Sequence, residues 1–168
     1  MSEINENPVV EQETPGMPDT PQETPVASTS VLNLAIESVM DEIDKLHAFS
    51  PITRGALGTD NGLACEIAPS YTSEVYMDKN SFEPVTLALN GKHHDLRLLS
   101  DTLNNIMDTL SRMKSYPSGN GWEIVDITKG LLPRIIGRED NNAYLMAADL
   151  VIKIFRKDEE PNESELGE

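Results

Sequence analysis

The sequence predicts an α+β fold in which a mostly antiparallel β-sheet packs against two α-helices, with disordered acidic segments at both ends. Three observations predict this fold. Apolar residues recur at helical spacing in two segments, they alternate at strand spacing in several others, and acidic residues accumulate at the termini. The order along the chain is one helix, two or three strands, a second helix and two more strands.

The two ends of the chain differ in composition from the part between them. Residues 1–29 contain six acidic and no basic side chains, and five prolines lie between Pro8 and Pro25. Such a segment has few large apolar side chains to offset the entropy of ordering, so we expect a disordered N-terminal arm. Residues 157–168 carry one lysine against six acidic residues and are expected to form a second solvated tail. The expected α+β domain therefore spans residues 30–156.

The formal net charge of −16 is shared unequally among these three parts. The arm contributes −6, the C-terminal tail −5 and residues 30–156 the remaining −5. A mildly acidic domain without a basic cluster is a poor match for duplex phosphates, which are bound through several Lys or Arg side chains per site. We therefore expect DNA to be no specific ligand of this chain.

The first expected helix lies in "SVLNLAIESVMDEIDKLHAF", behind Ser30 as a candidate N-cap. Its apolar residues recur at spacings of three and four: Leu32, Ile36, Val39, Ile43 and Leu46. Pro51 and the following "RGALGTDNG" are expected to end this helix and to form a turn-rich connection. Beyond it, Leu63, Cys65 and Ile67 alternate with other residues and predict a first strand.

Two further extended segments are expected in "SEVYM" and "PVTLAL", the latter with Val85, Leu87 and Leu89 on one face. Asn90-Gly91 is interpreted as the turn at the end of that strand. The second helix follows, with an apolar stripe spaced three and four residues apart: Leu96, Leu99, Leu103, Ile106, Leu110 and Met113. This stripe covers only about two and a half heptads between strands, so it predicts packing on a sheet rather than a coiled coil.

The last strands are expected in "WEIVDI" and "AYLMAADLVIKIF". The longer one has an apolar side made of every second residue: Tyr144, Met146, Ala148, Leu150, Ile152 and Ile154. Its other side mixes apolar residues with Asp149 and Lys153. Between these strands, "LLPRIIGREDNNAY" is interpreted as a charged loop punctuated by Pro133 and Gly137.

His93, His94 and Asp95 lie between a strand and a helix and are the candidate metal or acid–base residues. A zinc site needs further ligands, but the only other histidine is His47, and the sequence has neither a C-x-x-C pair nor an H-E-x-x-H motif. We therefore interpret the three residues as a turn in which Asp95 caps the helix.

The sequence also lacks the signatures of other catalytic or cofactor sites. There is no G-x-S-x-G elbow, no P-loop and no dinucleotide fingerprint, and Cys65 is interpreted as a small strand residue. We predict no catalytic, cofactor-binding or metal site, and no enzymatic activity. No apolar run has the length of a membrane span and the N-terminus does not resemble a signal peptide, so we expect a soluble protein made in the cytosol, without a membrane partner.

In the order of its predicted elements and in several short sequence motifs, the chain resembles the tail terminators, or minor capsid proteins, of long-tailed bacteriophages. The resemblance covers Val85 to Arg156. It rests on "LNGKH" after a strand, "DTLNNI" in a helix, a tryptophan strand, "LLPRIIGRE", and a long last strand ending in basic residues. The acidic arm departs from the compact form of the family.

The resemblance implies a structural protein of the virion, located at the head–tail junction and assembled in the host cytoplasm. Proteins of this kind form a ring, generally of six copies, at the head-proximal end of the tail tube. The implied partners are further copies of the chain, the tail tube protein and the head connector or head-closure protein. DNA would pass through the ring without specific binding, and no cofactor is implied.

The candidate subunit or partner interface lies in the charged segment and on the last strand. Its residues are Arg134, Arg138, Glu139, Asp140, Asp149 and Lys153. Two alternatives remain open at this point. One is a head-closure or tail-to-head joining protein, and the other, from a different class, is a small acidic adaptor or inhibitor.

Overall fold

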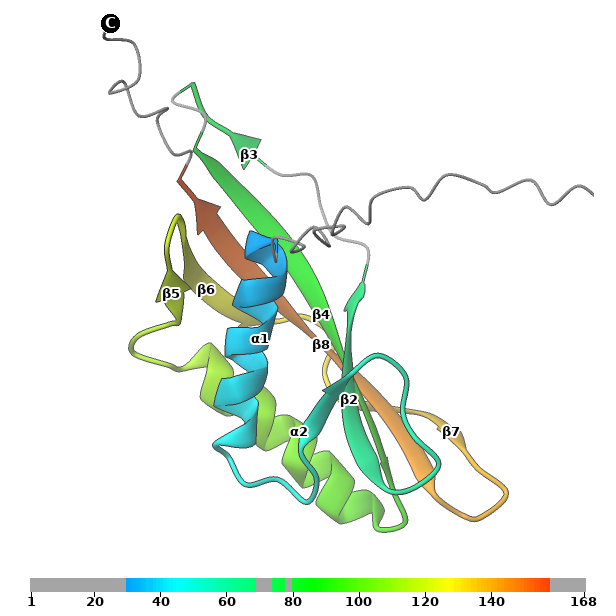
Figure 1. Ribbon diagram of the computed structural model, residues 1–168. Helices are drawn as coiled ribbons and strands as arrows, with labels where there is room; N and C mark the ends of the chain where they lie inside the picture. Colours follow the sequence, from blue (N-terminus) through cyan, green and yellow to red (C-terminus); the bar gives the residue numbers. More distant parts are fainter. Residues whose placement is uncertain (1–29, 69–73, 78–79, 158–168) are drawn as a thin grey trace, which may run out of the picture.

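The computed structural model describes residues 30–68, 74–77 and 80–157 of the 168-residue chain. The expected disordered arm and all of the expected C-terminal tail except Lys157 lie outside these described residues. Within them the chain forms two α-helices and one mostly antiparallel sheet, which confirms the predicted α+β class (Figure 1). The elements in chain order are α1 (Val31–Asp44), β1 (Ile52–Arg54), β2 (Gly62–Ala68), β3 (Glu74–Val75), β4 (Ser81–His93), α2 (Leu96–Ser111), β5 (Ser118–Gly119), β6 (Trp122–Lys129), β7 (Arg134–Arg138) and β8 (Tyr144–Arg156).

The sheet is built around two long strands, β4 and β8. The order of its main path is β1-β2-β4-β8-β6-β5, while β3 pairs with the start of β4 and β7 pairs with the start of β8. β4 and β8 pair antiparallel over their full length, from Ser81 opposite Arg156 to His93 opposite Tyr144. β8 therefore holds together the two halves of the sheet.

One hydrophobic core lies between the helices and one face of the sheet. Every second residue of β4 and β8 faces this core, so that Leu87 lies opposite Leu150 and Val85 opposite Ile152. This is the period-two pattern from which these strands were predicted. The opposite face, which we call the outer face, carries the alternate residues of the same strands, including Asp149 and Lys153.

The helices meet the core through most of the apolar stripes expected from their spacing, but Leu46 and Met113 lie beyond the ends of α1 and α2 and are only partly buried. In α1 the buried residues are Ala35, Ile36, Val39 and Ile43. In α2 they are Leu99, Leu103, Ile106, Met107 and Leu110. The side chain of Ser30 accepts a hydrogen bond from the Asn33 backbone N–H at 3.3 Å, which confirms its role as the N-cap of α1.

The prediction of a turn at Asn90-Gly91 is wrong, because β4 continues without interruption to His93. Asn90 and Gly91 pair with Ala147 and Met146 of β8. A glycine is required at position 91 by packing rather than by a turn. A Cβ atom there would lie 2.6 Å from Cδ1 of Leu99 on α2, so the absence of a side chain lets the helix approach the strand.

The prediction of a loop in "LLPRIIGREDNNAY" is also wrong in its centre, where Arg134–Arg138 forms strand β7 and a hairpin with β8. Only the residues from Glu139 to Ala143 form the turn. The strand lacks apolar alternation for two reasons. It has a partner on one side only among the described residues, and a register shift between Ile135 and Gly137 breaks the period of two.

The connection after the first helix contains a strand that the sequence pattern did not predict. Ile52–Arg54 forms β1, which pairs in parallel with β2. Parallel pairing of two consecutive strands requires the chain to cross back before it can re-enter the sheet. Residues 55–61 make this return, starting at Gly55 with a φ angle of 99°.

Candidate interaction surface

The segment that carries both adjacent histidines connects β4 to α2. His93 is the last residue of β4 rather than a turn residue, and His94 and Asp95 lead into α2. The carboxylate of Asp95 accepts hydrogen bonds from the backbone N–H groups of Arg97 at 2.9 Å and Leu98 at 3.2 Å, which confirms the predicted N-cap. Nδ1 of His93 accepts a hydrogen bond from the Asp95 N–H at 2.8 Å, and its ring packs against Phe49. Both Asp95 and His93 thus stabilise the strand-to-helix connection. In the described part of the chain, no three His, Cys, Asp or Glu side chains gather as metal ligands would.

Cys65 lies on β2 with its side chain fully buried. Burial raises the pKa of its thiol above the usual range of a cysteine, and this outweighs the opposing effect of the Arg54 guanidinium. A thiol with a raised pKa is a weak nucleophile at neutral pH. Its position agrees with the interpretation of Cys65 as a small strand residue.

The six candidate interface residues fall into two separate groups. Arg134 and Arg138 lie at the two ends of β7, and Glu139 and Asp140 follow in the turn of the hairpin. Asp149 and Lys153 lie further along β8 on the outer face of the sheet. The structure therefore brings together four of the six residues, at the β7–β8 hairpin, and leaves the other two on the central part of the sheet.

Not all four hairpin residues are available for a partner. A carboxylate oxygen of Glu139 lies 3.3 Å from Nζ of Lys92, whose side chain is almost completely buried. The same ammonium group donates hydrogen bonds to the backbone carbonyl oxygens of Gly58 at 2.5 Å and Thr59 at 2.8 Å. Glu139 thus helps to hold the β1–β2 connection and the hairpin turn together.

Lys92 is a structural residue that the sequence pattern did not identify. The turn expected at Asn90-Gly91 would have left Lys92 outside the strand, but Lys92 lies near the end of β4, opposite Leu145 of β8. Only 2% of its surface is exposed, because the connection of residues 55–61 and the hairpin turn cover it. The sequence offers one signal for its position. If the strand continues past Asn90, Lys92 lies on the same outer face as Asn90, because alternate residues of a strand share a face.

The remaining hairpin residues form an exposed edge that combines apolar and basic side chains. Leu132, Ile135 and Ile136 are 64%, 55% and 54% exposed. Arg134 and Arg138 flank the two isoleucines and are also exposed, and the Arg138 guanidinium lies 4.9 Å from the centre of the Tyr144 ring. We call this surface, from Leu131 to Arg138, the β7 edge.

The backbone of the β7 edge has a partner on one side only. β7 pairs with β8, and within the described residues no strand pairs with its other side. The ladder also continues upstream, where Gly130 N–H donates to the Asp149 carbonyl and Asp149 N–H donates to the Leu131 carbonyl. An edge strand presents unpaired N–H and C=O groups, and exposed apolar side chains make it a template for pairing with another chain.

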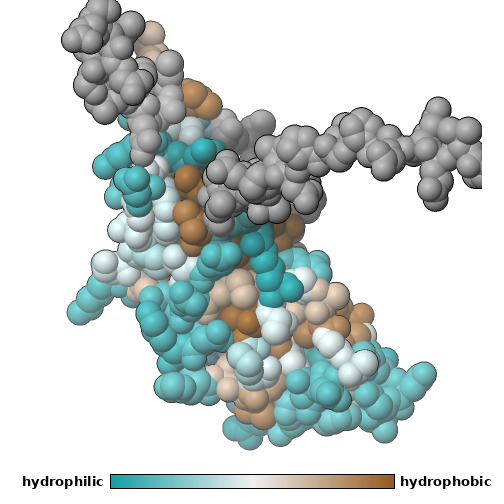
Figure 2. All heavy atoms as spheres, viewed as in Figure 1, coloured by the Kyte–Doolittle hydropathy of each residue, from teal (hydrophilic) through white to brown (hydrophobic). Residues whose placement is uncertain are grey.

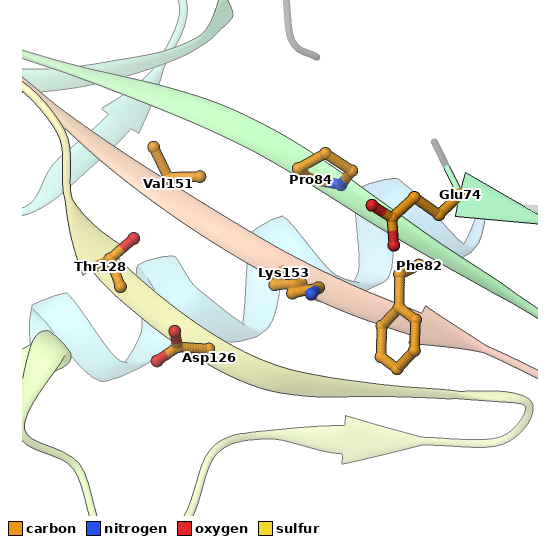
Figure 3. Close-up of a pocket in the computed structure, with 7 residues that line it drawn as sticks. All are labelled: Glu74, Phe82, Pro84, Asp126, Thr128, Val151 and Lys153. Atoms are coloured by element: carbon orange, nitrogen blue, oxygen red, sulfur yellow. The ribbon is translucent and has the colours of Figure 1, made fainter. Parts of the chain in front are cut away.

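The outer face of the sheet also carries a hollow around Lys153. This hollow of about 400 Å³ is lined by residues of β3, β4, β6 and β8. Figure 3 shows Lys153 between Asp126 on one side and Glu74 and Phe82 on the other. Nζ of Lys153 lies 4.8 Å from the centre of the Phe82 ring. The hollow thus places charges of both signs beside an aromatic ring on the outer face.

Apolar side chains are also exposed outside the β7 edge, among them Val75, Tyr76 and Met77 at 70%, 49% and 105%. Figure 2 shows brown patches interspersed with hydrophilic residues on one face of the molecule. Within the described residues, no helix is both long and apolar enough to span a bilayer. Neither protein-family models nor curated proteins gave a match to this chain.

Proposed function

We propose that this chain is a structural protein of a phage virion that forms a ring at the head-proximal end of the tail tube. In this role it stops polymerisation of the tube and offers a surface to the head connector or head-closure protein. The observation that carries the proposal is the β7 edge, where Leu132, Ile135 and Ile136 are exposed beside strand backbone that pairs on one side only among the described residues. A surface of this kind favours association with another protein chain.

The position of the edge also suits a ring. It lies on a hairpin at one end of the sheet (Figure 1). In a closed ring each subunit offers one surface to the next copy and receives a different one. A projecting hairpin supplies such a surface. The resemblance of residues 85–156 to tail terminators includes this hairpin, since "LLPRIIGRE" is one of its marks.

The charge distribution is compatible with passage of DNA through the ring. Residues 30–156 carry a formal net charge of −5, and the arm and tail add further negative charge. Several such copies around a channel would repel phosphates rather than bind them. DNA could then pass without being held by the ring.

A double charge reversal in the hairpin tests this function. Arg134→Glu with Arg138→Glu should abolish ring formation while leaving the melting temperature nearly unchanged, because exposed charged side chains contribute at most about 1 kcal/mol each to stability. Arg112→Glu with Lys114→Glu is the matched control, since both residues are exposed and the change in net charge is the same. Ring formation would be measured by sedimentation and electron microscopy of the purified protein with tail tubes.

The length of tails in lysates identifies which role is lost. Overlong tubes for the hairpin variant, with normal tails for the control, are expected of a terminator. Tails of normal length that fail to join heads would assign the chain to head closure or tail-to-head joining. If the folded variant still yields uniform tails joined to heads, the hairpin is not the interface. If the wild-type protein stays monomeric or dimeric and does not bind tail tubes, the chain would instead be assigned to the small acidic adaptors or inhibitors.

A further inference from the structure

The β7 edge and the end of β6 before it carry basic side chains and no acidic ones. Between Ile127 and Arg138 the chain has three basic side chains, Lys129, Arg134 and Arg138, and no acidic one. Lys129 is held by an ion pair with Asp108 on α2, whereas Arg134 and Arg138 are exposed. The strand that pairs with this edge must therefore match two arginines that flank two isoleucines.

A second β7 strand is a poor match for this edge. If two copies of β7 paired antiparallel over their full length, Arg134 of one copy would lie opposite Arg138 of the other. Like charges directly opposite one another destabilise a strand pair. Shifted registers avoid this contact but pair fewer residues. The complementary partner is an extended segment with acidic residues around a β-branched centre.

The chain contains such a segment in its own N-terminal arm. Residues 6–13 read "ENPVVEQE", with Val9 and Val10 between acidic residues and no basic side chain. If Val10 lies opposite Ile135 in an antiparallel pair, Val9 lies opposite Ile136 and Glu11 opposite Arg134. Arg138 then lies opposite Asn7, next to Glu6. Pro8 is compatible with this arrangement, because an added strand becomes the new edge of the sheet, where proline is tolerated.

The position of α1 favours exchange of this segment between copies. Sixteen residues separate residue 13 from Ser30, and when extended they span about 50 Å. The start of α1 lies toward the end of the molecule that carries β3, whereas the β7–β8 turn lies at the opposite end (Figure 1). In a head-to-tail ring, the β7 edge of a neighbouring copy can lie close to the point where the arm joins α1. The β7 edge of the same copy lies at the far end of the molecule from that point.

We infer that residues 6–13 of one copy add as a strand to the β7 edge of the next copy. This inference deepens the proposed assembly role and rests on it. Strand addition would give affinity through main-chain hydrogen bonds, while the valines and glutamates would select the partner. It would also cover the exposed isoleucines of each subunit in a closed ring.

Cross-linking between two full-length variants tests the inference. One variant carries Val10→Cys and the other, distinguishable by an affinity tag, carries Ile135→Cys; a short bismaleimide reagent joins nearby thiols. We expect a heterodimer of the two variants on a denaturing gel. Thr20→Cys paired with Ile135→Cys is the control, since it places the thiol on the same arm outside the proposed strand. The native Cys65 is buried in every sample.

A charge exchange tests the proposed pairing itself. Arg134→Glu in the receiving copy should slow cross-linking about fivefold, and Glu11→Arg in the donating copy should restore the rate. No restoration, or a yield equal to that of the Thr20→Cys control, would overturn the inference. A product formed by Ile135→Cys alone would instead assign the edge to β7–β7 pairing. In a single chain carrying both cysteines, cross-linking confined to the monomer would show that the arm binds its own copy.

The readouts separate this inference from the proposed function. Cross-linking is measured on free protein, without tail tubes. If rings form and cap tubes but the arm does not cross-link, the inference fails and the proposed function stands. If the arm exchanges between copies but tubes are not capped, arm exchange stands and the terminator function fails.

Discussion

The ammonium group of Lys92 joins three stretches of the chain that are far apart in sequence. It holds the carbonyl oxygens of Gly58 and Thr59 and the carboxylate of Glu139 at the end of β4. A buried ammonium group is costly unless its donors are satisfied, and here three oxygen-bearing partners satisfy them. This one residue therefore fixes how the turn of the β7–β8 hairpin lies against the β1–β2 connection.

Replacing Lys92 by methionine keeps the length of the apolar stem but removes the ammonium group. We expect Lys92→Met to lower the free energy of unfolding by about 1–3 kcal/mol, because hydrogen bonds to a charged donor are lost. Urea denaturation followed by circular dichroism measures the change. Lys114→Met, at an exposed position, is the control and should change stability by no more than about 0.5 kcal/mol. Equal stability of the two variants would contradict the role given to Lys92.

The contact between β4 and α2 depends on the absence of a side chain at Gly91. A Cβ atom at this position would lie 2.6 Å from Cδ1 of Leu99 and 3.3 Å from Cδ2 of Leu63, both of which are buried. The helix can lie close to the strand only because this space is free. Two elements are thus positioned by one residue that contributes no side chain.

Gly91→Ala should therefore destabilise the domain by about 1–3 kcal/mol, as expected for overpacking a filled core. Gly58→Ala is a suitable control, because a Cβ atom there meets nothing within 4 Å. Thermal unfolding of both variants at the same concentration measures the difference. A Gly91→Ala protein as stable as the Gly58→Ala protein would show that Leu99 moves aside at no cost.

The elements that the sequence predicted are those whose buried residues follow one period. The stripes that contain Ile36 and Leu103, and the alternation along β8, each reflect a single face turned toward the core. Two features escaped prediction because each is explained by a residue of another element rather than by its own segment. Gly91 has a turn-like composition but is explained by Leu99, and Lys92 is explained by Glu139, 47 residues later.

The candidate site was predicted in part for a related reason. Arg134 and Arg138 were identified because charges of both signs lie close together in the sequence. Ile135 and Ile136 were not, because exposed apolar residues on a one-sided strand follow no burial period. Whether Glu139 is free or already paired could not be deduced from the sequence, since its partner lies on β4.

At the scale of the whole molecule, the hydrophobic core described above is formed by residues between the arm and the C-terminal tail. Its buried apolar residues run from Ala35 to Ile154. Deleting residues 1–29 should therefore leave the melting temperature of the monomer nearly unchanged, since the arm has little apolar surface to bury. Calorimetry at concentrations where the protein is monomeric measures this. A loss of several degrees would mean that the arm packs on its own domain.

The order of strands in the sheet has a consequence for how the chain folds. The residues paired between β4 and β8 are 51 apart in the chain at His93–Tyr144 and 75 apart at Ser81–Arg156. Contacts of such long range close large loops before they gain stability, so they slow folding. β8 also follows all other described strands in the chain, yet it lies at the centre of the sheet. During synthesis, β4 and β6 therefore cannot take their places in the sheet until β8, which pairs with both, has been made. A stop codon just before Tyr144 would remove a central strand of the sheet rather than an edge strand.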